Sequence, residues 1–139
     1  MAKYYLSILF IFCLSKGNFA QKADDIIGFY FVVDPFSAEE TQIQIYKTNS
    51  GIYCGIVVWV KKEENRKYEG LEFLKGLKYN EKDSEWIDGK IKYPGKDNDF
   101  NVYMSFASDK KLKIRAYWGV SLLGKTIYWT KEDKKRTHK

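Results

Sequence analysis

Apolar side chains recur along this chain in short runs, and in most runs they alternate with polar ones. Clusters of Gly, Pro, Asn, Asp and Ser separate the runs. An alternation with a period of two places one face of a strand in a core and the other in solvent. The pattern predicts eight β-strands, at residues 26–33, 41–48, 51–60, 71–79, 85–93, 99–106, 111–118 and 125–131.

Eight strands with short connections favour an all-β fold, an eight-stranded antiparallel up-and-down barrel. Closure into a barrel removes the exposed edges of an open sheet. A barrel of this size holds either packed side chains or one small ligand. Only residues 37–40 resemble the start of a helix, and we expect a single capped turn there.

The hairpin of residues 99–118 predicts its own register. One face is apolar when Phe106 lies opposite Leu112, Met104 opposite Ile114, Val102 opposite Ala116 and Phe100 opposite Trp118. The other face is polar, and it places Tyr103 opposite Arg115. A shift by one residue would put lysine and arginine opposite phenylalanines, so the hydrophobic pattern specifies the pairing.

Outer-membrane barrels also have eight strands, and their outward face must be apolar. Here Lys90, Lys92, Lys113 and Arg115 lie in the middle of predicted strands. Each such charge costs about 2–4 kcal/mol at the middle of a bilayer. We therefore expect a barrel that faces water, with no membrane span.

The first twenty residues differ from the rest. Lys3 precedes an apolar run, YYLSILFIFCL, which is too short to span a bilayer and is typical of a signal peptide. Cleavage is expected after Ala20, with Gly17 as the alternative. The predicted organisation is a cleaved signal peptide (1–20), a barrel domain (21–130) and a basic flexible tail (131–139), located in the periplasm or outside the cell.

Charge and cysteine content narrow the list of partners. The 139 residues include 24 Lys and Arg against 18 Asp and Glu, and Lys3 and Lys16 leave with the leader. Cys54 then remains alone, so no internal disulfide forms and a core position is expected. The basic tail is interpreted as solvated, the alternative being attraction to an anionic surface. Export and the lack of a recognition motif disfavour nucleic acid.

Catalytic patterns are not apparent in the sequence. The single histidine, His138, lies in the tail, which leaves no Ser-His-Asp or Cys-His arrangement. One cysteine and one histidine cannot form a zinc site, and no glycine-rich phosphate loop is present. The remaining alternative is that Glu72, Glu85 and Asp88 converge inside the barrel as paired carboxylates. We expect a non-enzymatic protein without metal or cofactor.

Aromatic residues are abundant, with 4 Trp, 11 Tyr and 9 Phe. They either fill the interior or line a cavity for a small apolar ligand. The interior candidates for ligand binding are Phe73, Trp86, Phe100, Met104, Phe106, Trp118 and Trp129.

Leu122 and Leu123 stand in a connection where polar turn residues are typical. If Trp118 pairs with Ile127, residues 119–126 form the connection, and the leucines close that end of the barrel as a plug. The alternative is an exposed apolar rim for a partner protein or a membrane surface.

Two groups of residues resemble known families. Gly28 and Tyr30 open the first strand where lipocalins carry Gly-x-Trp, and Arg115 comes late in the chain, as their barrel-closing arginine does. The segments GIYCGIVVW, GLEFLKGL, WIDGKIKYP and LKIRAYWGVSLLGKTIYW resemble the exported bacterial family DUF2147 over residues 26–130. The chain departs from that family in lacking the aspartate of Ile-Tyr-Asp-Pro and in having Ala116 within Arg-Gly-Tyr.

The family resemblance implies a lipocalin-type barrel without an established activity. Two functions then remain. The first is non-catalytic binding of a small apolar or amphipathic ligand. The second is a packed barrel that docks on an envelope protein. A cavity of several hundred Å³ would favour the first. The oligomeric state is not predicted.

Overall fold

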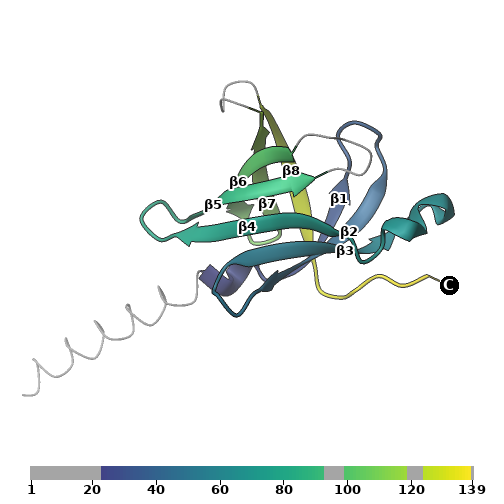
Figure 1. The fold of residues 1–139 in the computed structure, drawn as a ribbon, viewed down its shortest axis with the longest axis horizontal. Helices are drawn as coiled ribbons and strands as arrows, with labels where there is room; N and C mark the ends of the chain where they lie inside the picture. The colour runs from purple at the N-terminus through teal and green to yellow at the C-terminus, as the bar shows by residue number, and fades with distance from the viewer. Residues whose placement is uncertain (1–22, 93–98, 119–123, 139) are drawn as a thin grey trace, which may run out of the picture.

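The computed structural model describes residues 23–92, 99–118 and 124–138. Within them the strands form one closed antiparallel barrel in chain order, and β1 pairs with β8 (Figure 1). The elements are η1 (Ala23–Ile26), β1 (Gly28–Val33), β2 (Glu40–Lys47), β3 (Tyr53–Val60), η2 (Glu63–Tyr68), β4 (Glu72–Asn80), β5 (Glu85–Lys92), β6 (Asp99–Ser108), β7 (Lys111–Tyr117) and β8 (Lys125–Glu132), where η denotes a 3-10 helix. The predicted eight-stranded barrel is confirmed.

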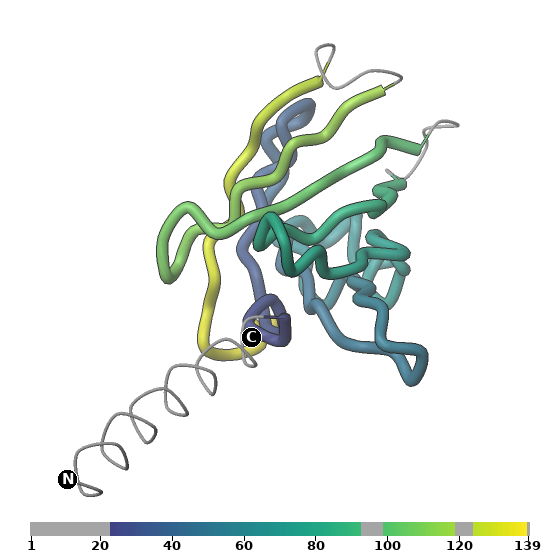
Figure 2. Tube along the Cα trace, turned by 90° about the vertical axis from the view of Figure 1, so that its left-hand side faces the viewer, coloured from purple at the N-terminus to yellow at the C-terminus, as the bar shows by residue number. Residues whose placement is uncertain are grey.

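The barrel has two distinct ends. Because neighbouring strands run in opposite directions, the last residues of β1, β3, β5 and β7 and the first residues of β2, β4, β6 and β8 lie at one end, here called the open end. The other end, here called the closed end, carries η1. In Figure 2, η1 lies at the lower end of the barrel and the β1–β2 connection at the upper end.

The short helix η1 seals the closed end. Ile26 is fully buried, and its carbonyl accepts a hydrogen bond of 2.7 Å from the hydroxyl of Tyr30. The indole Nε1 of Trp86 donates to the carbonyl of Ala23 at 3.0 Å. These bonds satisfy polar groups in the core, and they attach the helix to β1 and β5. The sequence pattern did not predict this helix.

The predicted register of the β6–β7 hairpin is confirmed. Phe106 lies opposite Leu112, Met104 opposite Ile114, and Tyr103 opposite Arg115. The predicted Phe100–Trp118 pair does not form, because the last pair at that end joins Asn101 to Tyr117 and β7 ends there.

The predicted pairing of Trp118 with Ile127 is wrong. Ile127 lies opposite Ile114, and Trp129 lies opposite Leu112. This register keeps Trp129 in the core at 1% exposure and leaves Trp118 beyond the last paired residue, where 61% of it is exposed. Trp118 is therefore not an interior residue.

The C-terminal segment (residues 133–138) corrects the expectation of a solvated tail that begins at residue 131. β8 continues to Glu132, and the segment then contacts the outer surface of the barrel through Arg136 and His138. In Figure 1 it passes below β3 and ends near η2.

Candidate functional site

A cavity of about 320 Å³, here called the open-end cavity, lies at the open end of the barrel. Its deep part is apolar and its mouth is polar. The deep residues are Val32, Ile43, Val57, Val60 and Phe73, and the residues at the mouth are Asp34, Phe36, Ser37, Glu39, Thr41, Asn65 and Tyr68. The volume falls at the lower end of the range of about 300–1,000 Å³ typical of ligand pockets.

Strand alternation accounts for the apolar part of the cavity. Ile43 on β2 and Val57 on β3 lie opposite each other and point inward. Two backbone hydrogen bonds join the β3–β4 connection to Val57 in the middle of β3: Val57 N–H donates to the Leu71 carbonyl at 2.9 Å, and Gly70 N–H donates to the Val57 carbonyl at 2.7 Å. The connection carries η2, so these bonds place Asn65 and Tyr68 at the mouth.

A second cavity of about 190 Å³ lies at the same end, between the β1–β2 connection and the β7–β8 hairpin. Phe36 lines both cavities. Phe100, Trp118 and Ile127 form part of the second lining. Phe36 is 56% exposed, and it is therefore an aromatic residue at the mouth rather than in the core.

The predicted interior residues separate into three groups. Trp86, Met104 and Trp129 are buried in the core, and Phe106 packs against it. Phe73 is the one that lines the larger cavity, and its ring centroid lies 6.3 Å from that of Trp129. Phe100 and Trp118 border the second cavity.

The closed half of the barrel is filled by aromatic contacts. The rings of Trp86 and Phe106 meet edge to face at 5.6 Å between centroids, and Tyr79 lies 5.0 Å from Trp86. Tyr30 lies 6.2 Å from Trp129. The expectation of a packed interior holds for this half, and the expectation of a cavity holds for the open end.

Sequence reasoning missed the residues of the mouth. Asp34, Phe36 and Glu39 come from the β1–β2 connection, and Asn65 and Tyr68 come from η2. A signal was available, because the segment 61–70 is long for a hairpin connection, and loops of that length carry binding residues more often than short turns do.

The residues proposed for barrel closure do not form one group. Gly28 (φ 152°) lies against Lys131, whose Cε would be 3.1 Å from an added Cβ. Tyr30 is buried at the closed end, whereas Arg115 lies on the outer face and donates to Thr126 Oγ1 at 3.3 Å. The structure thus places Arg115 opposite Tyr103 and not on Tyr30. The other two closure residues, Leu122 and Leu123, lie outside the described residues.

One buried donor in the described part of the chain has no hydrogen-bond partner, the indole Nε1 of Trp129. The side chain is 1% exposed and lies beside Phe73, which lines the cavity. A buried polar group left unpaired costs about 1–3 kcal/mol.

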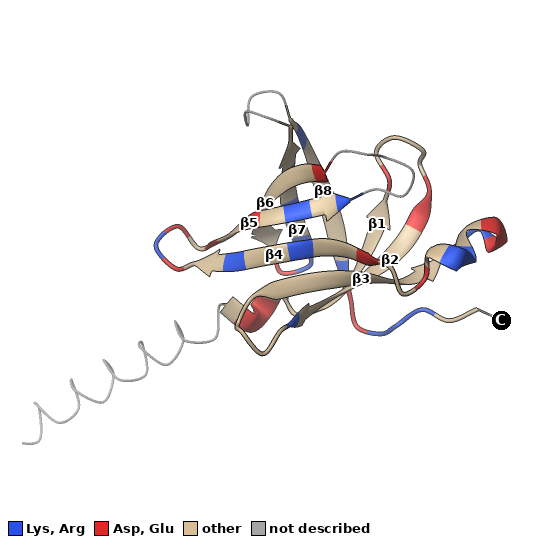
Figure 3. Ribbon diagram, viewed as in Figure 1, with Lys and Arg blue, Asp and Glu red and all other residues tan. Residues whose placement is uncertain are grey.

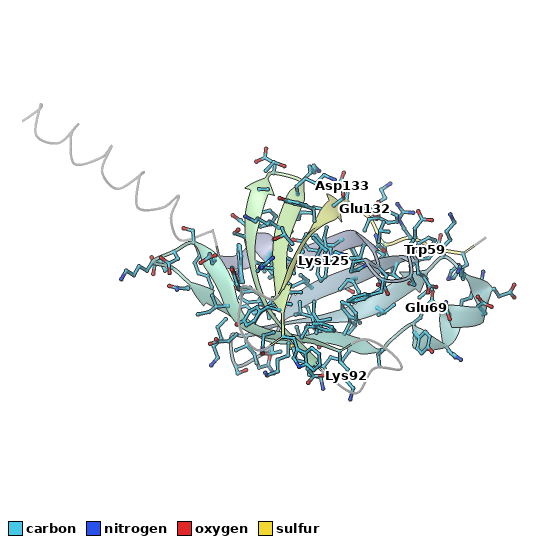
Figure 4. The ribbon with its side chains drawn as sticks, turned by 90° about the horizontal axis from the view of Figure 1, so that it is seen from above. Trp59, Glu69, Lys92, Lys125, Glu132 and Asp133 are labelled. Atoms are coloured by element: carbon cyan, nitrogen blue, oxygen red, sulfur yellow. The ribbon has the colours of Figure 1, made fainter. Side chains whose placement is uncertain are left out.

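A polar cluster joins the C-terminal segment to the outer face of β1–β3. Gln42 is fully buried there: its amide nitrogen donates to Glu132 Oε1 at 2.9 Å and to the Lys134 carbonyl at 2.8 Å, and its amide oxygen accepts the Arg136 N–H at 2.8 Å. The Arg136 guanidinium lies 5.0 Å from the ring centroid of Trp59. Figure 4 labels Trp59 and Glu132, two of the residues that receive this segment.

Two carboxylates of this cluster have perturbed pKa values. Arg136 forms two hydrogen bonds with Glu132, of 2.9 and 2.7 Å, and they lower the pKa of Glu132. Burial raises the pKa of Glu69, but the hydrogen bonds with His138 and the Val60 N–H, together with the charges of His138 and Arg66, outweigh burial, so the pKa lies below its ordinary value.

The described residues were compared with the requirements of a metal site, a reactive cysteine and a membrane-spanning helix. They contain no group of three or more His, Cys, Asp and Glu side chains placed to hold a metal ion. Cys54 is buried, at 6% exposure. None of the helices described is long and apolar enough to cross a membrane.

The sequence matches the model of a family described as uncharacterized protein conserved in bacteria (DUF2147), over residues 28–131. The chain belongs to this family. The resemblance seen in the sequence is thereby confirmed. Among curated proteins, none matches the chain.

Among solved structures, the fold of this DUF2147 protein is similar to that of protein HP1028 from the human pathogen Helicobacter pylori, which is described as belonging to the lipocalin family. The two share 18% sequence identity at a TM-score of 0.60, and the match covers 78% of this chain and 83% of that chain. At this identity the likeness supports a lipocalin-like fold.

Proposed function

We propose that this barrel is an exported, non-catalytic protein that binds one small apolar or amphipathic molecule in the open-end cavity. The observation that carries the proposal is the combination of a 320 Å³ space, an apolar floor and a polar mouth. A closed barrel that is filled at one end and hollow at the other suits a single small ligand.

The apolar floor would supply most of the binding free energy. Burial of apolar surface contributes about 25 cal/mol per Å², against which the costs of association and ordering must be set. A short aliphatic chain seated against Ile43, Val57 and Phe73 would bind with a Kd of about 1 μM to 1 mM on this basis. The signal peptide proposed for residues 1–20 would place the protein in the periplasm or outside the cell.

A neutral probe tests the proposal. Isothermal titration calorimetry with 1-octanol should show one binding site. Val57→Phe, which fills the cavity, should abolish this binding. The matched control is Val58→Phe, the same substitution at the next position of β3. It should retain binding, because Val58 does not line the cavity. Circular dichroism is the control for folding, and both variants should give the spectrum of the unchanged protein. No binding of 1-octanol, or equal binding by the two variants, would contradict the proposal.

A second candidate function, docking on an envelope protein, is favoured by one observation. Trp118 and Phe36 are 61% and 56% exposed and both border the second cavity. Large exposed aromatic side chains that share a surface are typical of interaction sites. Cross-linking in intact envelopes should then capture a partner that Trp118→Ala and Phe36→Ala both lose. Capture that these variants leave unchanged would contradict the docking function.

A further inference from the structure

The charged side chains of the open-end cavity have one sign. Of the described residues that line it, Asp34 and Glu39 are charged, and both are acidic. The protein as a whole carries a net charge of +6, so the charge at the mouth is opposite in sign to the net charge of the protein. Figure 3 shows red segments at both ends of the β1–β2 connection.

Neutral groups hold both carboxylates in place. Asp34 Oδ1 accepts the Phe36 N–H at 2.8 Å. Glu39 Oε1 accepts a hydrogen bond from the amide nitrogen of Asn65. Within the described part of the chain, neither carboxylate forms an ion pair within 4.0 Å. These contacts orient the two side chains without neutralising their charges.

The aromatic rings of the mouth are compatible with positive charge. The Lys67 ammonium lies 5.3 Å from the ring centroid of Tyr68, and the Lys125 ammonium lies 5.9 Å from that of Phe36. Both lysines are exposed, and neither belongs to the cavity lining. Another nearby lysine, Lys61, pairs with Glu40 outside the cavity. The faces of aromatic rings attract cations through their quadrupole.

We propose that the ligand is an amphipathic amine. This inference rests on the proposed function, because it assigns a headgroup to the ligand of the same cavity. The apolar tail lies against Val57 and Phe73, and the ammonium group lies at the mouth, where it donates hydrogen bonds to the carboxylates of Asp34 and Glu39. The acidic mouth thus determines specificity, and the apolar floor supplies affinity.

Electrostatics separate this ligand from the fatty acid of equal length. An ammonium group forms charge-assisted hydrogen bonds with carboxylates, which are about twice as strong as neutral ones. A ligand carboxylate would instead enter a mouth that already holds two like charges, and like charges oppose binding. The preference for the amine should weaken with salt, because the mouth is open to solvent and screening is effective there.

Three probes of equal chain length test the inference: octylamine, 1-octanol and octanoate, titrated calorimetrically into the protein at pH 7 in low and high salt. We expect octylamine to bind about tenfold more tightly than octanoate in low salt, which corresponds to the gain of one charge-assisted hydrogen bond. The preference should shrink in high salt.

The double variant Asp34→Asn with Glu39→Gln removes both charges and keeps both hydrogen-bond acceptors. It should lower octylamine affinity about fivefold or more, the range expected for lost charge-assisted bonds, and should lower 1-octanol affinity by a smaller factor. The matched control is Glu63→Gln with Glu64→Gln, which removes two exposed carboxylates of η2 that do not line the cavity. The control should bind octylamine as the unchanged protein does.

The outcomes distinguish the two proposals. Binding of 1-octanol with octylamine no tighter than octanoate would overturn the amine inference and leave the proposed function standing. Octylamine affinity that falls equally in the control variant would also overturn the inference, since the effect would then come from net charge. Failure of 1-octanol to bind would overturn the proposed function, and the inference, which rests on it, with it.

Discussion

The imidazole of His138 stacks on the indole of Trp59, with 5.9 Å between ring centroids and 21° between ring planes. The same imidazole places Nε2 2.6 Å from Glu69 Oε2, which also accepts the Val60 N–H at 3.0 Å. Glu69 directly follows η2, and η2 borders the open-end cavity. The end of the chain therefore contacts the connection that shapes the mouth.

The contacts of Glu69 and Glu132 with the C-terminal segment predict that the protein becomes less stable in acid. In the folded protein the pKa of Glu69 lies below its ordinary value of 4.5, and that of Glu132 is lowered in the same way by Arg136. A carboxylate with a depressed folded pKa stabilises the fold above its unfolded pKa, and this contribution is lost as the pH falls through the folded value. We expect the free energy of unfolding to decrease below about pH 4.5, the unfolded value.

Urea titrations at a series of pH values measure this effect. Glu69→Gln should be less stable than the unchanged protein at neutral pH and should show a shallower loss in acid. Glu64→Gln, an exposed carboxylate of η2, is the control and should follow the unchanged protein. An unaltered pH dependence in Glu69→Gln would show that the Glu69 carboxylate does not stabilise the fold.

From the hydrogen bonds of Gln42 we expect that docking of the C-terminal segment stabilises the barrel. Both polar atoms of its fully buried amide bond to the segment or to Glu132. Gln42→Ala should lower the free energy of unfolding by about 1–3 kcal/mol, because it removes the buried amide to which Glu132 Oε1, the Lys134 carbonyl and the Arg136 N–H are hydrogen-bonded. Gln44→Ala changes a half-buried glutamine two positions along the same face of β2 and should cost less than about 0.5 kcal/mol, as surface substitutions usually do.

A double variant separates this contact from a local effect on β2. Gln42→Ala and Arg136→Ala together should cost less than the sum of the two single changes, because both act through the same docked segment. Additive losses in urea denaturation would mean that Gln42 stabilises the strand independently of the C-terminal segment.

The strand pattern could predict the barrel because buried residues alternate with more exposed ones along much of β1, β6 and β7. In the β6–β7 hairpin, a shift by one residue would put lysine or arginine opposite phenylalanine, and the predicted pairing of Met104 with Ile114 is confirmed. The β7–β8 register was not specified in this way. Ile127 and Trp129 face inward whether Ile127 pairs with Ile114 or with Trp118, since the two pairings differ by an even number of residues.

The cavity could be predicted only in part. The search for bulky interior side chains led to Trp86, Met104 and Trp129, which fill the closed half. The cavity lies at the other end, and its floor is mostly aliphatic. Its mouth depends on η2 and on the β1–β2 connection, whose positions follow from backbone contacts between strand ends. Local periodicity does not contain such contacts.

Trp86 is buried and Trp118 is exposed, so replacing them with alanine should destabilise the protein to different extents. Trp86→Ala should lower the free energy of unfolding by about 3–5 kcal/mol, because it empties a buried position. Trp118→Ala should cost less than about 1 kcal/mol, since 61% of Trp118 is exposed and it lies beyond the end of β7. Urea denaturation measures both losses. Equal losses would support the interior position that the sequence predicted for Trp118.

Gly89 on β5 is required by close packing inside the barrel. A Cβ at this position would lie 2.7 Å from Leu77 Cδ2 and 2.8 Å from Val102 Cγ2, closer than side-chain carbons approach. Gly89→Ala should therefore lower the free energy of unfolding by about 1–3 kcal/mol through overpacking. Leu77→Ala alone should cost about 2–5 kcal/mol, because it opens a void beside Gly89. In the double variant, the methyl group added at position 89 enters the void left at position 77. The double variant should therefore lose less free energy of unfolding than the sum of the two single variants. Additive losses in urea denaturation would show that Leu77 does not limit the space at Gly89.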